Sequence, residues 1–246
     1  MSELVGKRAL VTGASRGIGA GIALALAEQG ADVAITYERS ADRANELVRR
    51  IEAAGRRGVA IQADSADAAA VTRSVGEAAG GLGGLDILVN NVGTARMGAF
   101  VDLTLDDIDA LLNVNVRSAM LAIKAAIPHL GRGGRIISIG SNSAERAPFS
   151  GLAAYALTKS AYLGLSRHLA RELGPMGITV NVVQPGPTDT DMNPANGPLA
   201  DENRRLTSVL RYGTPADIAA AVVFLASPGA DFVTGATLTV DGGYNA

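Results

Sequence analysis

The chain has no cysteine and no tryptophan among its 246 residues. Without cysteine there are no disulfides, no thiolate metal sites and no cysteine nucleophile, and the composition suits a reducing cytoplasm, where we expect the protein. Its two histidines, His129 and His168, have no carboxylate or second histidine at the spacing of metal ligands. We therefore expect no metal site.

An excess of one charge and a long apolar run are also lacking. The 22 Lys and Arg residues balance 24 Asp and Glu residues, for a net charge of -2 and a pI near 5.7. The basic residues are scattered along the chain, which argues against nucleic acid as a partner. Residues 1–8 carry both signs of charge and lead into only three apolar residues before a glycine. That pattern is neither a signal peptide nor a membrane span, so we expect no membrane association.

Short apolar runs alternate with alanine-rich segments of helical spacing. Such alternation predicts a parallel sheet with helices on both faces, the runs being strands buried on both sides. The expected strands are 8–11, 33–35, 58–61, 87–89, 136–139, 178–183 and 237–240, and the expected helices are 20–29, 43–54, 66–79, 105–129, 155–173 and 216–226. The fold class is α/β, a doubly wound parallel sheet in a single Rossmann-like domain over residues 1–246.

A glycine-rich turn follows the first expected strand. Gly13, Gly17 and Gly19 allow a tight turn, and the helix after it directs free N–H groups toward a bound phosphate. The spacing is Gly-x-x-x-Gly-x-Gly and not the standard Gly-x-Gly-x-x-Gly fingerprint. Taken alone, the turn leaves two interpretations open, a dinucleotide site or a plain strand-to-helix connection.

The choice of dinucleotide depends on the end of the second strand. An acidic residue there binds the ribose 2′-hydroxyl of NAD, but this chain has Tyr37 at that position. Arg16 and Arg39 are placed to pair with a 2′-phosphate instead, so we expect NADP(H) as the preferred cofactor. Glu38 keeps NAD(H) open as an alternative, although it also fits a solvated loop charge.

Tyr155 and Lys159 are four residues apart in a helical segment, which places them on one face. A nearby ammonium favours the ionised form of a phenol, whose ordinary pKa is about 10. The pair therefore predicts acid–base chemistry at Tyr155, against the alternative of an incidental tyrosine on an amphipathic helix. Tyr162, on the same helix, is interpreted as a packing residue.

These motifs occur in the order found in one enzyme family. Thr12-Gly-x-x-x-Gly-Ile-Gly19 is followed by Asp64, Asn90-Asn91-Val92-Gly93, Asn115, Ser141, Tyr155-x-x-x-Lys159, Pro185-Gly186 and Asp241-Gly242-Gly243. Over essentially its whole length the chain resembles the short-chain dehydrogenases/reductases. The resemblance implies hydride transfer between a nicotinamide cofactor and a carbonyl carbon.

The resemblance also implies roles for individual residues. Tyr155 exchanges the proton at the substrate oxygen, Ser141 hydrogen-bonds that oxygen, and Lys159 holds the nicotinamide ribose and lowers the pKa of Tyr155. Asn115 binds, through its backbone, a water that links the lysine to solvent. Ser143 is a rival for the serine role because Ser141 is one residue further from Tyr155 than is usual. The implied cofactor-binding residues are Gly13, Ser15, Arg16, Gly17, Ile18, Gly19, Tyr37, Arg39, Asp64, Ser65, Asn91, Gly93, Tyr155, Lys159, Pro185, Gly186 and Thr188.

The sequence says less about the substrate. Residues 188–213 interrupt the strand–helix alternation with polar and turn residues, and we expect them to form a substrate loop. Reduction of a small-molecule ketone or a 3-oxoacyl thioester is the favoured activity. Around residues 185–198 the chain also resembles bacterial biofilm-dispersal members of the family that are linked to cyclic di-GMP, so a nucleotide sensor is the alternative. The resemblance further implies a homotetramer that pairs through the helices at 105–129 and 155–173 and through the carboxy-terminal strand.

Overall fold

Seven short apolar segments form one parallel sheet, as the sequence predicts. The computed structural model describes residues 2–246. The strand order is β3-β2-β1-β4-β5-β6-β7, and every neighbouring pair is parallel. The order reverses between β1 and β4, which is where open α/β sheets bind ligands beyond the carboxyl ends of the strands. The strands are β1 (Arg8–Val11), β2 (Asp32–Tyr37), β3 (Gly58–Gln62), β4 (Ile87–Asn90), β5 (Arg135–Ile139), β6 (Thr179–Pro185) and β7 (Thr237–Val240).

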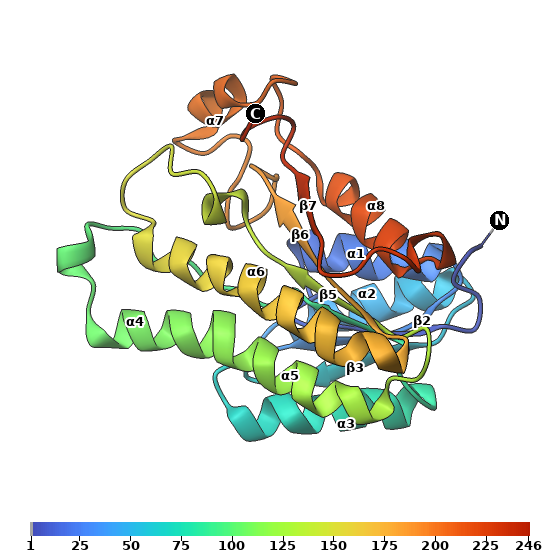
Figure 1. Ribbon diagram of the computed structural model, residues 1–246. Coiled ribbons are helices and arrows are strands. Elements are labelled where there is room, and N and C mark those ends of the chain that lie inside the picture. Colours follow the sequence, from blue (N-terminus) through green and yellow to red (C-terminus); the bar gives the residue numbers. More distant parts are fainter. Residues whose placement is uncertain (1) are drawn as a thin grey trace.

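Helices cover both faces of the sheet (Figure 1). One layer contains α1 (Gly17–Glu28), α2 (Ala41–Ala53) and α8 (Pro215–Ala226), and the other contains α3 (Ala68–Leu82), α4 (Leu105–Leu111), α5 (Ser118–Ala126) and α6 (Ala153–Leu173). Each layer has its own cluster of buried apolar side chains against the sheet. The fold class expected from the sequence is therefore confirmed.

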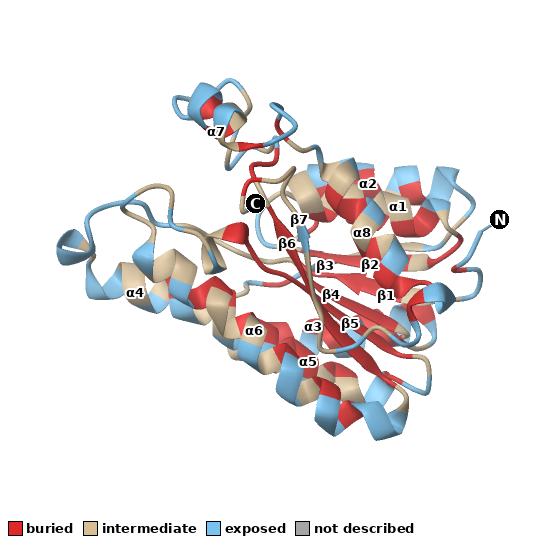
Figure 2. Ribbon diagram, turned by 45° about the horizontal axis from the view of Figure 1, so that its top comes forward, coloured by how far each residue is buried: buried red, intermediate tan, exposed pale blue. Residues whose placement is uncertain are grey.

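Burial along the sheet is uneven (Figure 2). Every residue of β4, β5 and β6 is buried, whereas β3 and β7 are mostly only partly buried. The expectation that all the strands are buried on both faces is wrong for these two, because they lie at the edges of the sheet and have a neighbour on one side only.

The run expected as one helix over 105–129 is continuous but irregular. It comprises α4, a π-helical segment (Leu112–Arg117), α5 and a 3-10 turn (Ile127–His129). Single π turns inside helices are rare and tend to mark functional sites. By length and mean hydropathy this run could cross a membrane, and within it α5 packs against α3 and β4.

The segment 188–213 contains a short helix, α7 (Ala200–Leu206), that the sequence analysis did not predict. Two buried hydrogen bonds hold it: Asn203 Nδ2 donates to Tyr212 Oη at 3.0 Å, and Tyr244 Oη donates to Asn203 Oδ1 at 3.2 Å. The remaining short helical turns of the described chain are Phe100–Asp102, Asn142–Ala144, Gly174–Met176 and Pro228–Ala230.

Candidate active site

The glycine-rich turn between β1 and α1 is shaped by close backbone approach. Gly13 has φ 62°, and a Cβ there would lie 2.7 Å from Val92 Cγ2. A Cβ on Gly19 would lie 2.4 Å from Asn91 Nδ2 and 2.8 Å from Ala14 Cα. Both positions therefore require glycine, the first for its conformation as well as its size. The turn brings α1 into close contact with the residues that follow β4.

Asn91, the first residue after β4, supports this turn. Its Nδ2 donates to Thr12 O at 2.9 Å and to Gly13 O at 3.1 Å, while Thr36 Oγ1 accepts from Gly13 N at 2.9 Å. The Asn91 side chain therefore holds the backbone of the glycine-rich turn in place.

The amino terminus of α1 fits a phosphate. Arg16 is its N-cap and makes no side-chain capping bond, and the first turn has no acidic residue. The first N–H groups of a helix need partners from outside the helix, and with the helix dipole they attract an anion. Ser15 and Ile18 are half-buried beside these groups. A pyrophosphate would supply the missing acceptors.

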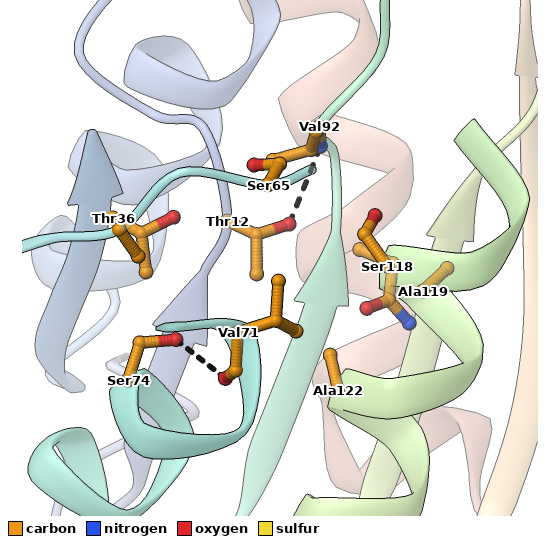
Figure 3. A pocket seen from close by; sticks show the side chains of 11 residues that line it. Thr12, Thr36, Ser65, Val71, Ser74, Val92, Ser118, Ala119 and Ala122 are labelled. Atoms are coloured by element: carbon orange, nitrogen blue, oxygen red, sulfur yellow. Dashed lines mark hydrogen bonds between the residues drawn. The ribbon is translucent and has the colours of Figure 1, made fainter. Parts of the chain in front are cut away.

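A small cavity lies beside the turn, at the carboxyl ends of the first four strands (Figure 3). Thr12 and Val92 face it from the β1 and β4 ends, Ser65 from the segment after β3, and Ser118 from α5. Asp64, implied to hold adenine, is exposed just before Ser65, and its Oδ1 accepts from Ala66 N at 2.8 Å. The implied adenine-binding residues and the turn therefore meet at one edge of the sheet.

The residues expected to select the cofactor lie at the end of β2 and the start of α1, and both arginines among them form ion pairs with carboxylates of the protein. Tyr37 is the last residue of β2, so no carboxylate stands at the acid position itself. Arg39 pairs with its neighbour Glu38 at 2.8 Å and has a side chain 89% exposed. Arg16 pairs with Asp191 of the 188–213 segment at 3.1 Å.

Lys159 is one of the buried members of the predicted catalytic set. Its residue is 4% exposed, and its Nζ donates to Ile139 O at 2.9 Å, which ties α6 to the end of β5. Burial lowers the pKa of Lys159 from 10.5 to about 8. Gly93 borders it: a Cβ there would come within 3.3 Å of the Nζ.

Ser141 and Tyr155 face each other across the site. Ser141 is buried two residues beyond the end of β5, and Tyr155 lies in the first turn of α6. Burial raises the pKa of Tyr155 above its ordinary value, and a hydrogen bond with the Ser141 side chain partly offsets the rise. Ser141 Oγ also accepts from Ser143 N at 3.2 Å, so the rival serine supports Ser141 through its backbone.

Lys159 lies close to Tyr155, and the effect expected of it on the phenol remains a prediction. The ammonium lies 5.9 Å from the centre of the Tyr155 ring and makes its hydrogen bond to the Ile139 carbonyl. Burial is the largest influence on the pKa of both groups: it raises the pKa of Tyr155 and lowers that of Lys159.

Asn115 lies in the π-helical segment and is fully buried. Its Oδ1 accepts from Thr94 N at 2.8 Å, and its Nδ2 donates to Thr94 O and Thr158 Oγ1, both at 2.9 Å. The side chain therefore joins the segment after β4 to α6. Its backbone carbonyl, expected to hold a water, accepts a hydrogen bond from the Tyr162 hydroxyl.

Tyr162 therefore has polar contacts in addition to the packing role predicted for it. Tyr162 is 2% exposed, and the centre of its ring lies 5.4 Å from the Lys159 Nζ. Its hydroxyl donates a hydrogen bond to the Asn115 carbonyl. Its position seven residues after Tyr155, two helical turns on, was the available signal.

The remaining implied cofactor residues follow β6. Pro185 ends that strand, a Cβ on Gly186 would lie 2.6 Å from Asp241 Cα, and Thr188 is buried with its Oγ1 donating to Gly186 O at 3.0 Å. Thr188 also bridges to Gly213, which closes the base of the 188–213 segment. These residues stand at the same edge of the sheet as the glycine-rich turn and Ser141.

Comparison with known proteins agrees with this arrangement. Residues 13–245 match the family model described as enoyl-(acyl carrier protein) reductase. The chain is 45% identical to the cyclic-di-GMP-binding biofilm dispersal mediator protein of Escherichia coli over the full length of both chains. It is 41% identical to the 3-oxoacyl-[acyl-carrier-protein] reductase FabG of Staphylococcus aureus, covering 96% of this chain and 97% of that protein.

Among solved structures, it is similar to a short chain dehydrogenase from Burkholderia cenocepacia in complex with NADP. The two share 58% identity and a TM-score of 0.98, over 99% of this chain and 100% of the other. Full-length matches at these identities, with the ordered motifs gathered at one edge of the sheet, show that the chain belongs to the short-chain dehydrogenase/reductase family.

Proposed function

We propose that this protein is an NADPH-dependent carbonyl reductase in which Tyr155 is the general acid. The observation that carries the proposal is the convergence of Ser141, Tyr155, Lys159 and Asn115 beside a turn built for a pyrophosphate. Membership of the family makes this protein an oxidoreductase, and our proposal adds that its substrate is a carbonyl compound.

Several features support NADP(H) as the cofactor. The relative from Burkholderia cenocepacia binds NADP, and in this chain the residue that ends β2 is tyrosine instead of an acid. Arg16 stands at the start of α1, with its guanidinium reaching toward the solvent-exposed side of that turn. When bound, NADPH supplies the hydride that reduces the carbonyl carbon.

Tyr155 and Ser141 act on the substrate oxygen. As hydride reaches the carbonyl carbon, negative charge develops on the oxygen, and the Ser141 hydroxyl donates a hydrogen bond to it. Tyr155 gives its phenolic proton to the same oxygen, so that an alcohol is released. The raised pKa of Tyr155 keeps the phenol protonated at neutral pH, which suits it to act as an acid in the reducing direction.

Lys159 restores the proton. With a pKa of about 8 it is largely charged at pH 7 yet able to give up a proton near that pH. It lies close to both Tyr155 and Tyr162, and the Tyr162 hydroxyl leads on to the Asn115 carbonyl. We propose that these groups carry the proton between the phenol and solvent.

The 188–213 segment is proposed as the substrate loop. It leaves β6 at the carboxyl edge of the sheet, next to Thr188, and its helix α7 is tied to Tyr244 near the chain end. Asn245 Nδ2 in turn donates to Asn142 O at 3.2 Å, next to Ser141. The substrates that fit are ketones and 3-oxoacyl thioesters, the latter class being named for the Staphylococcus relative.

The test is NADPH and NADH oxidation by the purified protein with simple ketones, diketones and 3-oxoacyl thioesters. Turnover that prefers NADPH, and that falls at least a hundredfold in Tyr155→Phe and Ser141→Ala, is the expected result. Ser143→Ala is the matched control and should keep most of the activity. Cofactor titration of Tyr155→Phe, by nicotinamide fluorescence, should show binding retained. Full turnover in Tyr155→Phe would refute the mechanism.

The relative from Escherichia coli supports a second function, binding of a signalling nucleotide. We propose it as an addition to catalysis, because every predicted catalytic residue is present. Calorimetric titration with cyclic di-GMP, with and without saturating NADPH, tests it. Binding that is unaffected by NADPH would indicate a separate site, and no heat at high protein concentration would reject this function.

We propose a homotetramer because exposed apolar residues lie on α4, the π-helical segment, α5 and α6. Leu105, Leu112, Met120 and Leu157 have exposed fractions of 79%, 40%, 52% and 61%. A second copy of the chain that covers them would remove this apolar surface from water. Light scattering should show a tetramer that Met120→Glu splits into smaller species, and a monomer at micromolar concentration would refute the proposal.

A further inference from the structure

Two tyrosine rings of α6 lie beside the buried ammonium of Lys159. Tyr155 is four residues before the lysine and Tyr162 is three residues after it, so all three side chains share one face of the helix. The Lys159 Nζ is 5.9 Å from the ring centre of Tyr155 and 5.4 Å from that of Tyr162. Both distances are within the range of about 6 Å at which the face of an aromatic ring attracts a cation. The proposed mechanism uses the hydroxyl groups of these tyrosines but not their rings.

The ammonium has few other groups that stabilise its charge. An ammonium has three donors, and here it makes one hydrogen bond, to Ile139 O at 2.9 Å. No carboxylate within residues 2–246 forms a salt bridge with Lys159. The segment after β4 and the π-helical segment contribute Gly93 and Asn115, which do not titrate. The titratable side chains beside the ammonium are therefore the two tyrosines of its own helix.

The ring of Tyr162 is fixed at its far end. Its hydroxyl donates a hydrogen bond to the backbone carbonyl of Asn115, in the π-helical segment. The residue is buried in a small apolar cluster with Ala119 and Val182. A buried side chain that is bonded at its tip has little freedom to turn. The π-helical segment thus holds the Tyr162 ring next to Lys159.

A ring and an aliphatic side chain affect a buried cation differently. Both exclude water, which disfavours the charged form of a lysine. The ring in addition has a negative face, whose attraction for a cation becomes stronger when the pair is removed from water. An aliphatic residue in place of Tyr162 would keep the exclusion of water and lose the attraction, so Lys159 would give up its proton at a lower pH.

We infer that Tyr162 is a positioning residue of the site, and that its ring, fixed by the Asn115 carbonyl, keeps Lys159 in the ammonium form. The inference deepens the proposed function and rests on it in one respect, namely that the ammonium is the form that returns a proton to Tyr155. Reduction should therefore stop at a lower pH when the ring is missing. The hydroxyl of Tyr162 contributes by holding the ring in place.

The test is a titration of Lys159 by NMR in the free protein. The chain contains three lysines, so protein with ¹³C-labelled lysine gives three Cε signals, and Lys159→Met assigns the one that belongs to Lys159. Tyr162→Phe keeps the ring, whereas Tyr162→Leu and Tyr162→Met remove it. The methionine variant is included because a flexible side chain fills a core gap with less strain. Tyr212→Leu is the matched control, since Tyr212 is a buried tyrosine whose ring lies beside Arg204.

We expect Tyr162→Leu and Tyr162→Met to lower the titration midpoint of Lys159 by about one pH unit, which is about a tenfold change in its acid dissociation constant. Tyr162→Phe should change the midpoint by less than about 0.3 pH unit, because the ring remains. Tyr212→Leu should leave it unchanged. In the pH profile of NADPH oxidation, the loss of activity at high pH should move to lower pH by the same amount in the two aliphatic variants and not in Tyr162→Phe.

Three results would overturn the inference. A midpoint in the aliphatic variants that equals or exceeds that of the wild type would show that burial alone sets the charge of Lys159. A shift in Tyr162→Phe as large as in Tyr162→Leu would assign the effect to the hydroxyl, and an equal shift in Tyr212→Leu would assign it to general loosening of the fold. If Tyr162→Leu does not fold, Tyr162→Met decides.

The NMR titration needs no turnover, which separates the inference from the proposed function. A protein in which Lys159 titrates as expected, but which reduces no carbonyl, would contradict the proposed function and leave the role of the Tyr162 ring standing. A protein that reduces carbonyls, but in which the aliphatic variants do not shift the midpoint, would do the opposite.

Discussion

Replacing Lys159 by methionine should make the protein more stable at neutral pH while it abolishes reduction. The lysine is buried, and its ammonium has one hydrogen-bond acceptor, the Ile139 carbonyl. Burial moves its pKa from 10.5 to about 8, so the charged form is disfavoured in the folded protein relative to the unfolded chain. Methionine has a similar length and no charge to bury.

The magnitude follows from the shift. With 1.36 kcal/mol per pKa unit, the charged lysine costs about 3 kcal/mol of folding free energy at pH 7. The lost hydrogen bond to Ile139 O offsets about 1 kcal/mol, which leaves a net gain of about 2 kcal/mol for Lys159→Met. The folded-state pKa is the lower one, so the unfolded chain binds more protons between about pH 8 and pH 10.5. The cost in the wild type therefore falls as pH rises, to about 2 kcal/mol at pH 9 and about 1 kcal/mol at pH 10.

The assay is urea unfolding of the wild type and variant at pH 7, 9 and 10, at equal protein concentration. Lys124→Met is the matched control, because Lys124 is exposed on α5 and its loss should change stability little at any of these pH values. A Lys159→Met protein that is less stable than the wild type at pH 7 would refute the reasoning. So would a stability difference that stays constant as pH rises.

Three further changes test other parts of the site. Asn115→Ala should lower the free energy of unfolding by about 2–4 kcal/mol in a denaturation experiment, because it removes a buried side chain and leaves the partly buried N–H and C=O of Thr94 without partners; a loss below 1 kcal/mol would contradict this. Gly19→Ala places a methyl group 2.4 Å from Asn91 Nδ2, so titration should show NADPH affinity at least tenfold lower, and unchanged affinity would show that the turn can relax. Asp217→Asn removes a capping box from α8 and should cost about 1 kcal/mol at pH 7. The hydrogen bond from Arg211 is the main reason that the pKa of Asp217 lies below 3.8 in the folded protein. The stabilisation by the Asp217 carboxylate is therefore lost as pH falls below about 4. The unfolding curves of the wild type and Asp217→Asn should converge there and not at higher pH.

The strands and the main helices could be predicted because their signals are local. Apolar runs bounded by glycine and polar residues locate all seven strands, although nothing within β3 or β7 reveals that each is an edge strand. Helix α7 was missed because it is short and polar, and because it is held by Tyr212 and Tyr244 from outside the helix.

The sequence identifies the residues of the candidate site, but it does not predict the contacts that they make in the folded protein. The order of motifs names Tyr155 and Lys159, whereas the pKa of each depends on how deeply the finished fold encloses it. Asp191 and Arg43 are 148 residues apart, and only tertiary folding brings them together. Long-range ion pairs of this kind leave no periodic or compositional pattern in the sequence.

Because of the π-helical segment Leu112–Arg117, the site depends on the number of residues in this part of the chain as well as on their identities. A π turn contains about one residue more than an α turn, and successive residues of an α-helix are rotated by about 100° around its axis. Deleting one residue before Asn115 would produce a more regular helix, yet it would swing that side chain away from Thr94 and Thr158. We therefore expect a related chain that is one residue shorter here to lack this junction between the segment after β4 and α6, even where an alignment pairs its asparagine with Asn115.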